Sequence, residues 1–296
     1  MSKHVTYNEK KNLILAGGVA SRMKKAAENL QNVDAKLIEQ ADTLTKGMIS
    51  VGQDGKSLID YELYNAHLAG FEELLLLLHP EDNFTQAYYE NLMAKDKTFG
   101  LRILFATQYI AEDRVKPAGT ADAVLQALQQ HKEWQKGRFI ILNSDNLYSV
   151  NALNLLWNCK SDNALISYGK SALEFPEERI KAFAVIRTND EGFLENIIEK
   201  PEEEQTKAIE MKDGRVGVSM NAFVMEASQL IPCLENTPFH PVRNEKELPY
   251  AVSLLVHKIP NSVYVIPLDE NVPDLTSKYD ISIVQEYLER EYQNTF

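Results

Sequence analysis

The feature of the sequence that most constrains the fold is a pair of short apolar runs on either side of a segment with helical spacing. Residues 13–16 read Leu-Ile-Leu-Ala and stop at two glycines, while residues 74–78 are five consecutive leucines. Runs of this length are typical of strands that are buried on both faces of a sheet. Residues 57–69 carry apolar side chains at helical spacing and end at Gly70, which suits a helix C-terminus. This order predicts a right-handed crossover in a parallel sheet.

The same alternation continues along the chain. Helical spacing or apolar runs predict helices at 83–95, 120–130, 248–257 and 279–290, and strands at 101–106, 139–142, 216–225 and 263–268. Asp190-Glu191-Gly192, between the strand-like residues 182–187 and 193–199, predicts a hairpin. Repeats, low-complexity segments and Pro/Ser-rich linkers are absent from the sequence. We therefore expect a single α/β domain over residues 1–296, with a mixed, mostly parallel sheet.

Composition excludes several classes of protein. Of the 296 residues, 44% are hydrophobic and 25% charged, as in soluble globular proteins, and the net charge of −12 argues against a nucleic-acid binder. Cys159 and Cys233 are far apart and form no CxxC motif, so we expect neither a disulfide framework nor a zinc site. Residues 1–11 lack the apolar stretch of a signal peptide, and the run at 74–78 is too short to span a bilayer. These features predict a cytoplasmic protein that binds neither nucleic acid nor a membrane.

Glycine and a cation follow the first apolar run. In open α/β sheets, ligands bind beyond the carboxyl ends of the strands, which makes residues 15–23 informative. Gly17 and Gly18 would let backbone N–H groups approach a phosphate closely, and Arg22 would add a forked cation. The pattern is neither GxxxxGK[ST] nor GxGxxG, so it indicates neither a Walker-type ATPase nor a dinucleotide fold. Taken alone, it fits an ordinary strand–turn–helix corner better.

Four further clusters follow predicted elements. Gly119 precedes a helix whose free N–H groups suit a phosphate, although taken alone an ordinary helix start capped by Thr120 explains it better. Asp145 lies at a strand end, where its carboxylate suits Mg²⁺, and Ser144-Asp145-Asn146 is equally typical of a turn. Pro201 ends a strand and leaves Glu199 and Lys200 at its exit, where they could bind a ligand. The alternative is that they are a solvated ion pair on the surface. Asp274 precedes the last helix, where an acidic residue also favours the helix dipole.

The order of these clusters resembles the sugar nucleotidyltransferase family, of the glucose-1-phosphate thymidylyltransferase and uridylyltransferase type. The segments that carry the resemblance are residues 15–23, 45–48, 57–61, Gln108 with 117–121, Asp145-Asn146, 199–201, Asn221 and Asp274. They span nearly the whole chain, from about residue 13 to residue 287. This chain departs from the family pattern at Thr45, where the family usually has proline, at the inserted residues 109–116, and in the long stretch between Arg22 and Lys46.

The resemblance implies a fold, a reaction and a set of roles. The fold is a Rossmann-like three-layer α/β/α nucleotidyltransferase domain, with nucleotide binding in roughly residues 10–150 and sugar-phosphate binding in roughly 151–296. The reaction is an in-line attack by a sugar 1-phosphate oxygen on the α-phosphate of a nucleoside triphosphate, with release of pyrophosphate. The implied roles are catalysis by Arg22 and Lys46, nucleotide binding by Leu15, Ala16, Gly17, Gly18, Gln108, Pro117, Gly119 and Thr120, sugar-phosphate binding by Asn146, Glu199, Lys200 and Asn221, and Mg²⁺ binding by Asp145 and Asp274.

Two alternatives are kept beside this interpretation. A glycosyltransferase on a similar fold predicts a DxD-type metal motif, whereas this strand is followed only by Asp145-Asn146-Leu147. A non-catalytic sugar-nucleotide sensor would not need to keep Arg22, Lys46, Asp145 and Asp274 together. A glutamine amide can pair with the O4/N3 edge of uracil or thymine, so Gln108 favours UTP or dTTP. The expected partners are this triphosphate and a sugar 1-phosphate, while the sugar, the pathway and the oligomeric state (a homo-oligomer is one option) stay open.

Overall fold

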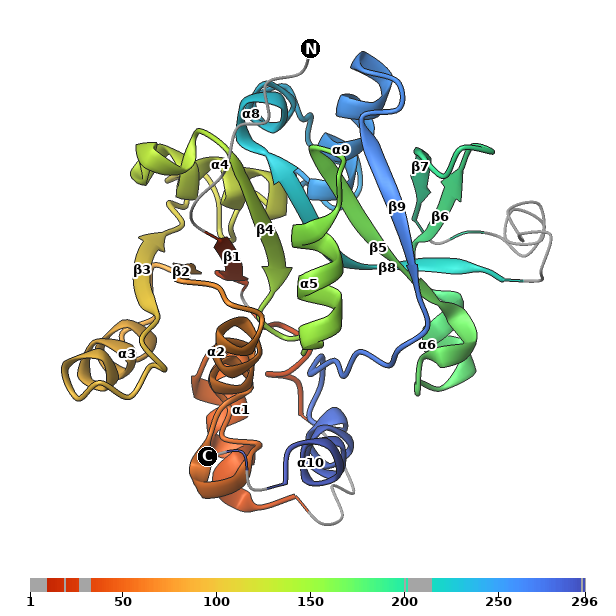
Figure 1. Cartoon of the computed structure of the whole chain (residues 1–296). Helices are drawn as coiled ribbons and strands as arrows, with labels where there is room; N and C mark the ends of the chain where they lie inside the picture. Colours follow the sequence, from red (N-terminus) through yellow and green to blue (C-terminus); the bar gives the residue numbers. More distant parts are fainter. Residues whose placement is uncertain are drawn as a thin grey trace.

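The computed structural model describes residues 10–18, 20–26, 33–199, 201, 215–293 and 295, and a nine-stranded sheet runs through these residues (Figure 1). The main path of the sheet has the order β3 (Arg102–Thr107), β2 (Glu73–Leu78), β1 (Lys11–Ala16), β4 (Arg138–Asn143), β8 (Gly217–Glu226), β5 (Asn163–Gly169) and β9 (Val263–Leu268). The first four strands are mutually parallel, β8 is antiparallel to both of its neighbours, and β9 is parallel to β5. The expected mixed, mostly parallel sheet is confirmed.

Alternate side chains along the strands enter two separate cores, one on each face of the sheet. Leu74, Leu76 and Leu78 pack with α2 (Leu58–Leu68), α3 (Thr85–Ala94) and α5 (Val150–Asn158). Leu75 and Leu77 pack on the other face with α4 (Thr120–Gln130), α8 (Ala227–Glu235) and α9 (Leu248–Lys258). The leucine run is therefore buried on both faces, and the three-layer α/β/α arrangement is confirmed.

Beyond the sheet, residues 33–43 pack against the last helix. Helix α1 (Ala35–Thr43) and α10 (Asp280–Glu291) contribute Leu37, Ala41, Ile281, Val284 and Leu288 to a third apolar cluster. Figure 1 shows the two helices together below the sheet, near the C-terminus. The hairpin strands β6 (Val185–Thr188) and β7 (Leu194–Ile198) pair as expected, and the short helix α6 (Glu177–Lys181) precedes them.

Several elements have no counterpart in the sequence-based expectations. These are α5, β5, α6 and α8. Strand β5 is buried along its whole length although it contains Asn163 and Ser167, whose polarity hides the strand signal. Helix α8 contains Pro232, a residue that normally argues against a helix interior, yet its apolar face is buried against the sheet. Among the described residues, no helix combines the length and the apolarity needed to cross a bilayer.

Candidate functional site

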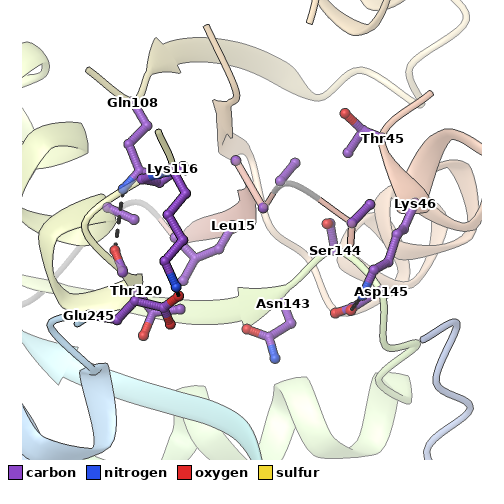
Figure 2. Close-up of a pocket in the computed structure, with 17 residues that line it drawn as sticks. Leu15, Thr45, Lys46, Gln108, Lys116, Thr120, Asn143, Ser144, Asp145 and Glu245 are labelled. Atoms are coloured by element: carbon purple, nitrogen blue, oxygen red, sulfur yellow. Dashed lines mark hydrogen bonds and ion pairs between the residues drawn. The ribbon is translucent and has the colours of Figure 1, made fainter. Parts of the chain in front are cut away.

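A cavity of about 270 Å³ opens where β1, β3 and β4 end (Figure 2). Its walls come from five segments: the turn after β1, the loop before α2, the β3–α4 connection, the exit of β4, and one residue of the second half of the chain. The lining consists of Leu15, Ala16, Gly17, Gly18, Ala20, Thr45, Lys46, Gln108, Lys116, Pro117, Gly119, Thr120, Ala123, Asn143, Ser144, Asp145 and Glu245.

The structure brings most of the expected nucleotide-binding residues together in this cavity. Residues 15–18 lie under it, and Pro117, Gly119 and Thr120 form one wall. The hydroxyl of Thr120 accepts a hydrogen bond from the N–H of Leu248 (2.9 Å), so it ties α4 to α9 rather than capping its own helix. Gly119, at the N-cap of α4, has φ +114°, and a Cβ there would collide with the backbone of Lys246. The helix start is thus shaped by close contact with a distant segment.

Lys46 and Asp145 form an ion pair at one end of the cavity. The Lys46 Nζ lies 2.7 Å from an Asp145 carboxylate oxygen, and the two side chains are 14% and 24% exposed. Lys46 begins a 3₁₀ turn (Lys46–Met48), while Asp145 follows β4. Thr45, next to Lys46, donates its hydroxyl to Asp82 (2.6 Å), which also accepts the N–H of Thr85 (2.9 Å) at the start of α3. The lysine is therefore held between two strand ends.

Asp274 lies beside Asp145 because two short segments pair there. The N–H of Leu275 donates to the carbonyl of Asp145 (2.7 Å), and the N–H of Leu147 donates to that of Pro273 (3.1 Å). Burial raises the pKa of Asp274 above its usual value, and the nearby charge of Asp145 adds to this, while Arg179 opposes it. Two carboxylates from distant segments thus share one small region.

Arg179, on α6, neutralises this second carboxylate. Its guanidinium lies 2.8 Å from one oxygen of Asp274 and 2.5 Å from Asp280, while the Thr276 hydroxyl donates to the other oxygen of Asp274 (2.5 Å). Burial lowers the pKa of Arg179, but the charges of Asp274 and Asp280 outweigh it and raise that pKa above its usual value. Each aspartate of the pair therefore has its own positive partner.

The aspartate pair fits a magnesium ion. Among the residues that the structure describes, no group of three or more His, Cys, Asp or Glu side chains is arranged to hold a metal. Magnesium is commonly held by only one or two carboxylates, with water and substrate phosphates completing its shell. Two adjacent carboxylates that disfavour each other's charge suit such an ion. A metal ion on Asp145 could use the oxygen that Lys46 does not contact, whereas at Asp274 it would have to displace Arg179 or Thr276.

The remaining predicted residues lie outside the lining. Arg22 is exposed on the turn that follows Ala20, and Asn146 is buried behind Asp145, where its Nδ2 has no partner among the described residues. Asn221 has φ +57°, in the part of β8 where the pairing with β5 is irregular. Glu199 lines a different cavity, of about 640 Å³, together with Arg243, whose guanidinium lies 3.3 Å away. Lys200 lies outside the described residues.

Sequence reasoning missed two charged residues of the lining. Lys116 belongs to the insertion at 109–116, and its Nζ lies 2.6 Å from the carboxylate of Glu245. Figure 2 shows this pair near Gln108, on the side of the cavity away from Lys46. The only available signal was the position of Lys116 directly before the Pro117 motif, and nothing in the sequence marks Glu245.

Comparison with known proteins places this geometry in a family. A model of the family described as nucleotidyl transferase matches residues 35–227, which is more than half of the chain. The chain belongs to the nucleotidyl transferase family. The resemblance expected from the order of the motifs is confirmed, although the glycine turn at 17–18 precedes the matched region.

Relatives of the family share part of their length with this chain. A glucose-1-phosphate adenylyltransferase of Granulibacter bethesdensis (strain ATCC BAA-1260 / CGDNIH1) is 28% identical over 192 residues, which is 64% of this chain and 42% of the relative. The enzyme of the same name from Rhodopseudomonas palustris (strain HaA2) is 25% identical over 232 residues, 77% of this chain and 50% of the relative. The chain spans about half the length of the curated relatives it matches.

A solved structure shares the fold over almost the whole chain. The UDP-glucose pyrophosphorylase from Acinetobacter baumanii superposes with a TM-score of 0.65 at 18% sequence identity. The match covers 97% of this chain and 95% of that one. At this identity the likeness concerns the fold.

Proposed function

We propose that this chain transfers a nucleotidyl group from a nucleoside triphosphate to a sugar 1-phosphate and releases pyrophosphate. The observation that carries the proposal is the ion pair of Lys46 and Asp145 at one end of a cavity that Gly17 and Gly18 also line, with Asp274 next to Asp145 just outside the lining. A glycine turn and a helix N-terminus suit phosphates because both present backbone N–H groups. Membership of the nucleotidyl transferase family supports the same reaction.

The proposed mechanism depends on positioning and charge more than on proton transfer. In-line attack of the sugar phosphate on the α-phosphate places additional negative charge on the oxygens of that phosphorus. Lys46, at the cavity end, would stabilise this charge, and the ion pair with Asp145 keeps its Nζ aimed there beforehand. A Mg²⁺ ion held by Asp145 and Asp274 would supply further neutralisation of the phosphates. Arg22, on the adjacent turn, would contact the triphosphate from outside the lining.

We assign the far end of the cavity to the base. Gln108 is buried there and lines the cavity, which supports a hydrogen-bond reader of a uracil or thymine edge, and hence UTP or dTTP. The names of the sequence relatives point instead to ATP, and that of the structural neighbour to a uridine nucleotide. Since all these names contain glucose, glucose 1-phosphate is the first sugar phosphate to test. Glu199, Lys200, Asn146 and Asn221 belong to the proposed sugar side.

The test is pyrophosphate release from a panel of ATP, CTP, GTP, UTP and dTTP with several sugar 1-phosphates, glucose 1-phosphate first. The proposal expects release that requires both substrates and Mg²⁺ and that is lost in Lys46→Ala. A glycosyltransferase would instead consume nucleotide sugars without forming pyrophosphate. A sensor would bind nucleotide sugar, measured by calorimetry, and would turn over no pair in the panel. Either of these last two results would overturn the proposal.

A further inference from the structure

The side chain of Gln108 has a fixed orientation at the base end of the cavity. Its Nε2 donates to the carbonyl oxygen of Gly119 and to a carboxylate oxygen of Asp122, each at 3.3 Å (Figure 2 draws the first of these). Both partners are oxygens that only accept, so the NH₂ end of the amide must face them. The carbonyl end, Oε1, must therefore point the other way.

The Oε1 atom of Gln108 lies against the turn after β1. A Cβ placed on Gly17 would come within 2.8 Å of it, so the glycine makes room for this oxygen. Gln108 is only 2% exposed and lines the cavity, and none of the described residues donates a hydrogen bond to Oε1. A buried acceptor without a donor costs free energy that a ligand N–H can recover.

Asp122 is itself well anchored. It lies in the first turn of α4, where a negative charge is favoured by the helix dipole. The same oxygen that accepts from Gln108 also accepts from Gln126 Nε2 at 2.7 Å. Asp122 thus stays an acceptor in a fixed place, and it leaves Gln108 one orientation.

We propose that Asp122 is a positioning residue that sets the hydrogen-bond polarity of the base site. It holds Gln108 so that only an acceptor faces the base, and the site therefore selects a base with an N–H at that point. This inference rests on the proposed function, because it takes the Gln108 end of the cavity as the base site. Uracil and thymine offer N3–H there, whereas cytosine has a bare N3 acceptor. UTP and CTP thus present the same base edge with inverted hydrogen-bond polarity, at N3 and at the 4-substituent, and with almost unchanged shape. ITP and ATP do the same for purines at N1 and the 6-substituent.

The test compares kcat/KM for UTP against CTP, and for ATP against ITP, in the wild type and in four variants. These are Asp122→Asn, Gln108→Met, the double variant, and Gln130→Met. Gln130 is a matched control because it also ties α4 to the end of β3, through two hydrogen bonds with the backbone of Thr107 (3.0 and 2.8 Å), without contacting Gln108 or Asp122. Thermal unfolding of every variant reports purely structural damage.

We expect the wild type to favour the base with the ring N–H, UTP over CTP or ITP over ATP, by about tenfold or more, and the opposite preference would contradict the inference. Asp122→Asn should lower that ratio several-fold, because an asparagine amide accepts either orientation of Gln108 and only the Gly119 carbonyl then holds its NH₂ end. Gln108→Met should do the same, and adding Asp122→Asn to it should change the ratio no further. Gln130→Met should lower the unfolding temperature and keep the ratio.

Three results would overturn the inference: an unselective wild type, a ratio that survives Asp122→Asn, or an equal loss in Gln130→Met. The same ratios are also measured as dissociation constants by calorimetry, without turnover. If no nucleotide is turned over but UTP and CTP still bind with a ratio that Asp122→Asn lowers, the proposed function fails while the inference stands. If turnover is normal and the ratio is unchanged in Asp122→Asn, the inference fails while the proposed function stands.

Discussion

The two ends of the cavity use polar groups in opposite ways. At the Lys46 end, four charged side chains already satisfy one another, as Lys46 pairs with Asp145 and Arg179 with Asp274. At the Gln108 end, a neutral amide is held by two hydrogen bonds and keeps one buried acceptor open. A ligand must break contacts at the first end and completes them at the second. Charge changes should therefore alter rate, and hydrogen-bond changes should alter selectivity.

The largest effect is expected at Asp274. Asp274→Asn keeps the shape of the side chain but removes a charge that would hold Mg²⁺ in the proposed mechanism, and it should lower kcat/KM by on the order of a thousandfold. The measurement is pyrophosphate release over a Mg²⁺ titration. Asp280→Asn is the control, since Asp280 contacts Arg179 as well but lies outside the segment that pairs with the Asp145 loop. Near wild-type turnover of Asp274→Asn at limiting Mg²⁺ would show that the second metal ligand is another residue.

Lys46→Ala should come next, with a loss of about a hundredfold or more in kcat, as for one electrostatic stabiliser of the transition state. The selectivity between triphosphates should not change, because Lys46 lies at the other end of the cavity from Gln108. Lys36→Ala is the control, since Lys36 is exposed on α1. If Lys36→Ala lost the activity and Lys46→Ala kept it, the catalytic lysine would be Lys36 and not Lys46.

A smaller effect is expected from the support of Lys46. Asp82→Asn weakens the hydrogen bond that holds Thr45, and it should lower kcat about tenfold through a less well placed lysine. Thr45 has φ −59° and Leu44 has ψ 163°, both of which a proline at position 45 accepts. Thr45→Pro should therefore restore most of kcat in the Asp82→Asn background.

Thr85→Val is the control for this pair of variants. It removes the other hydroxyl that Asp82 accepts, at 2.7 Å, and leaves the bond to Thr45 in place. Its cost should fall on thermal stability and not on kcat. A double variant that is no faster than Asp82→Asn alone would contradict the positioning of Lys46 through Thr45.

The smallest effect on turnover, and a clear one on stability, is expected at Glu62. This carboxyl is fully buried beneath the Asp145 loop and accepts the N–H of Tyr148 at 2.7 Å. Burial raises its pKa well above 4.5, although the N–H of Tyr148 opposes the shift. The folded chain therefore keeps a proton that the unfolded chain releases above pH 4.5, and the wild type loses stability as the pH rises.

Glu62→Gln removes this titration. Relative to the wild type it should gain up to about 1.4 kcal/mol of unfolding free energy per pH unit above 4.5, until the folded pKa is reached. Urea unfolding at pH 4 and pH 7 measures the difference, with kcat unchanged. A stability difference that is the same at both pH values would contradict a buried, protonated Glu62.

The sequence predicts the cavity residues that follow strands better than the cavity residues that come from distant loops. Gly17, Gln108 and Asp145 follow buried strands, and the carboxyl ends of parallel strands must meet at one edge of a sheet. Glu245 and Lys116 lie in segments without periodicity, and no local pattern shows where such a segment folds back. Glu199 follows a strand as expected, but its strand belongs to the hairpin beside the main path of the sheet, so it faces Arg243 in a neighbouring cavity.

Arg179 shows a second limit. It lies in a five-residue helix with charged neighbours, which is typical of a solvated surface, and only the folded chain brings it to Asp274. The pairing of distant charges depends on how α6 packs after β5, an element whose polar residues also concealed it. Local propensity thus identifies strand ends, while the contacts that tune them require the tertiary structure.

The position of β8 between β4 and β5 has a consequence for how the chain is made. On the ribosome, β1 to β4 are complete once Asn143 has emerged, but the antiparallel partner of β4 ends only at Glu226. For roughly ten seconds of synthesis, the nascent chain carries a parallel sheet whose β4 edge has no neighbour on one side. Unpaired strand edges are templates for association with other chains. During the interval before β8 is synthesised, the exposed edge of β4 is therefore open to aggregation unless a chaperone covers it.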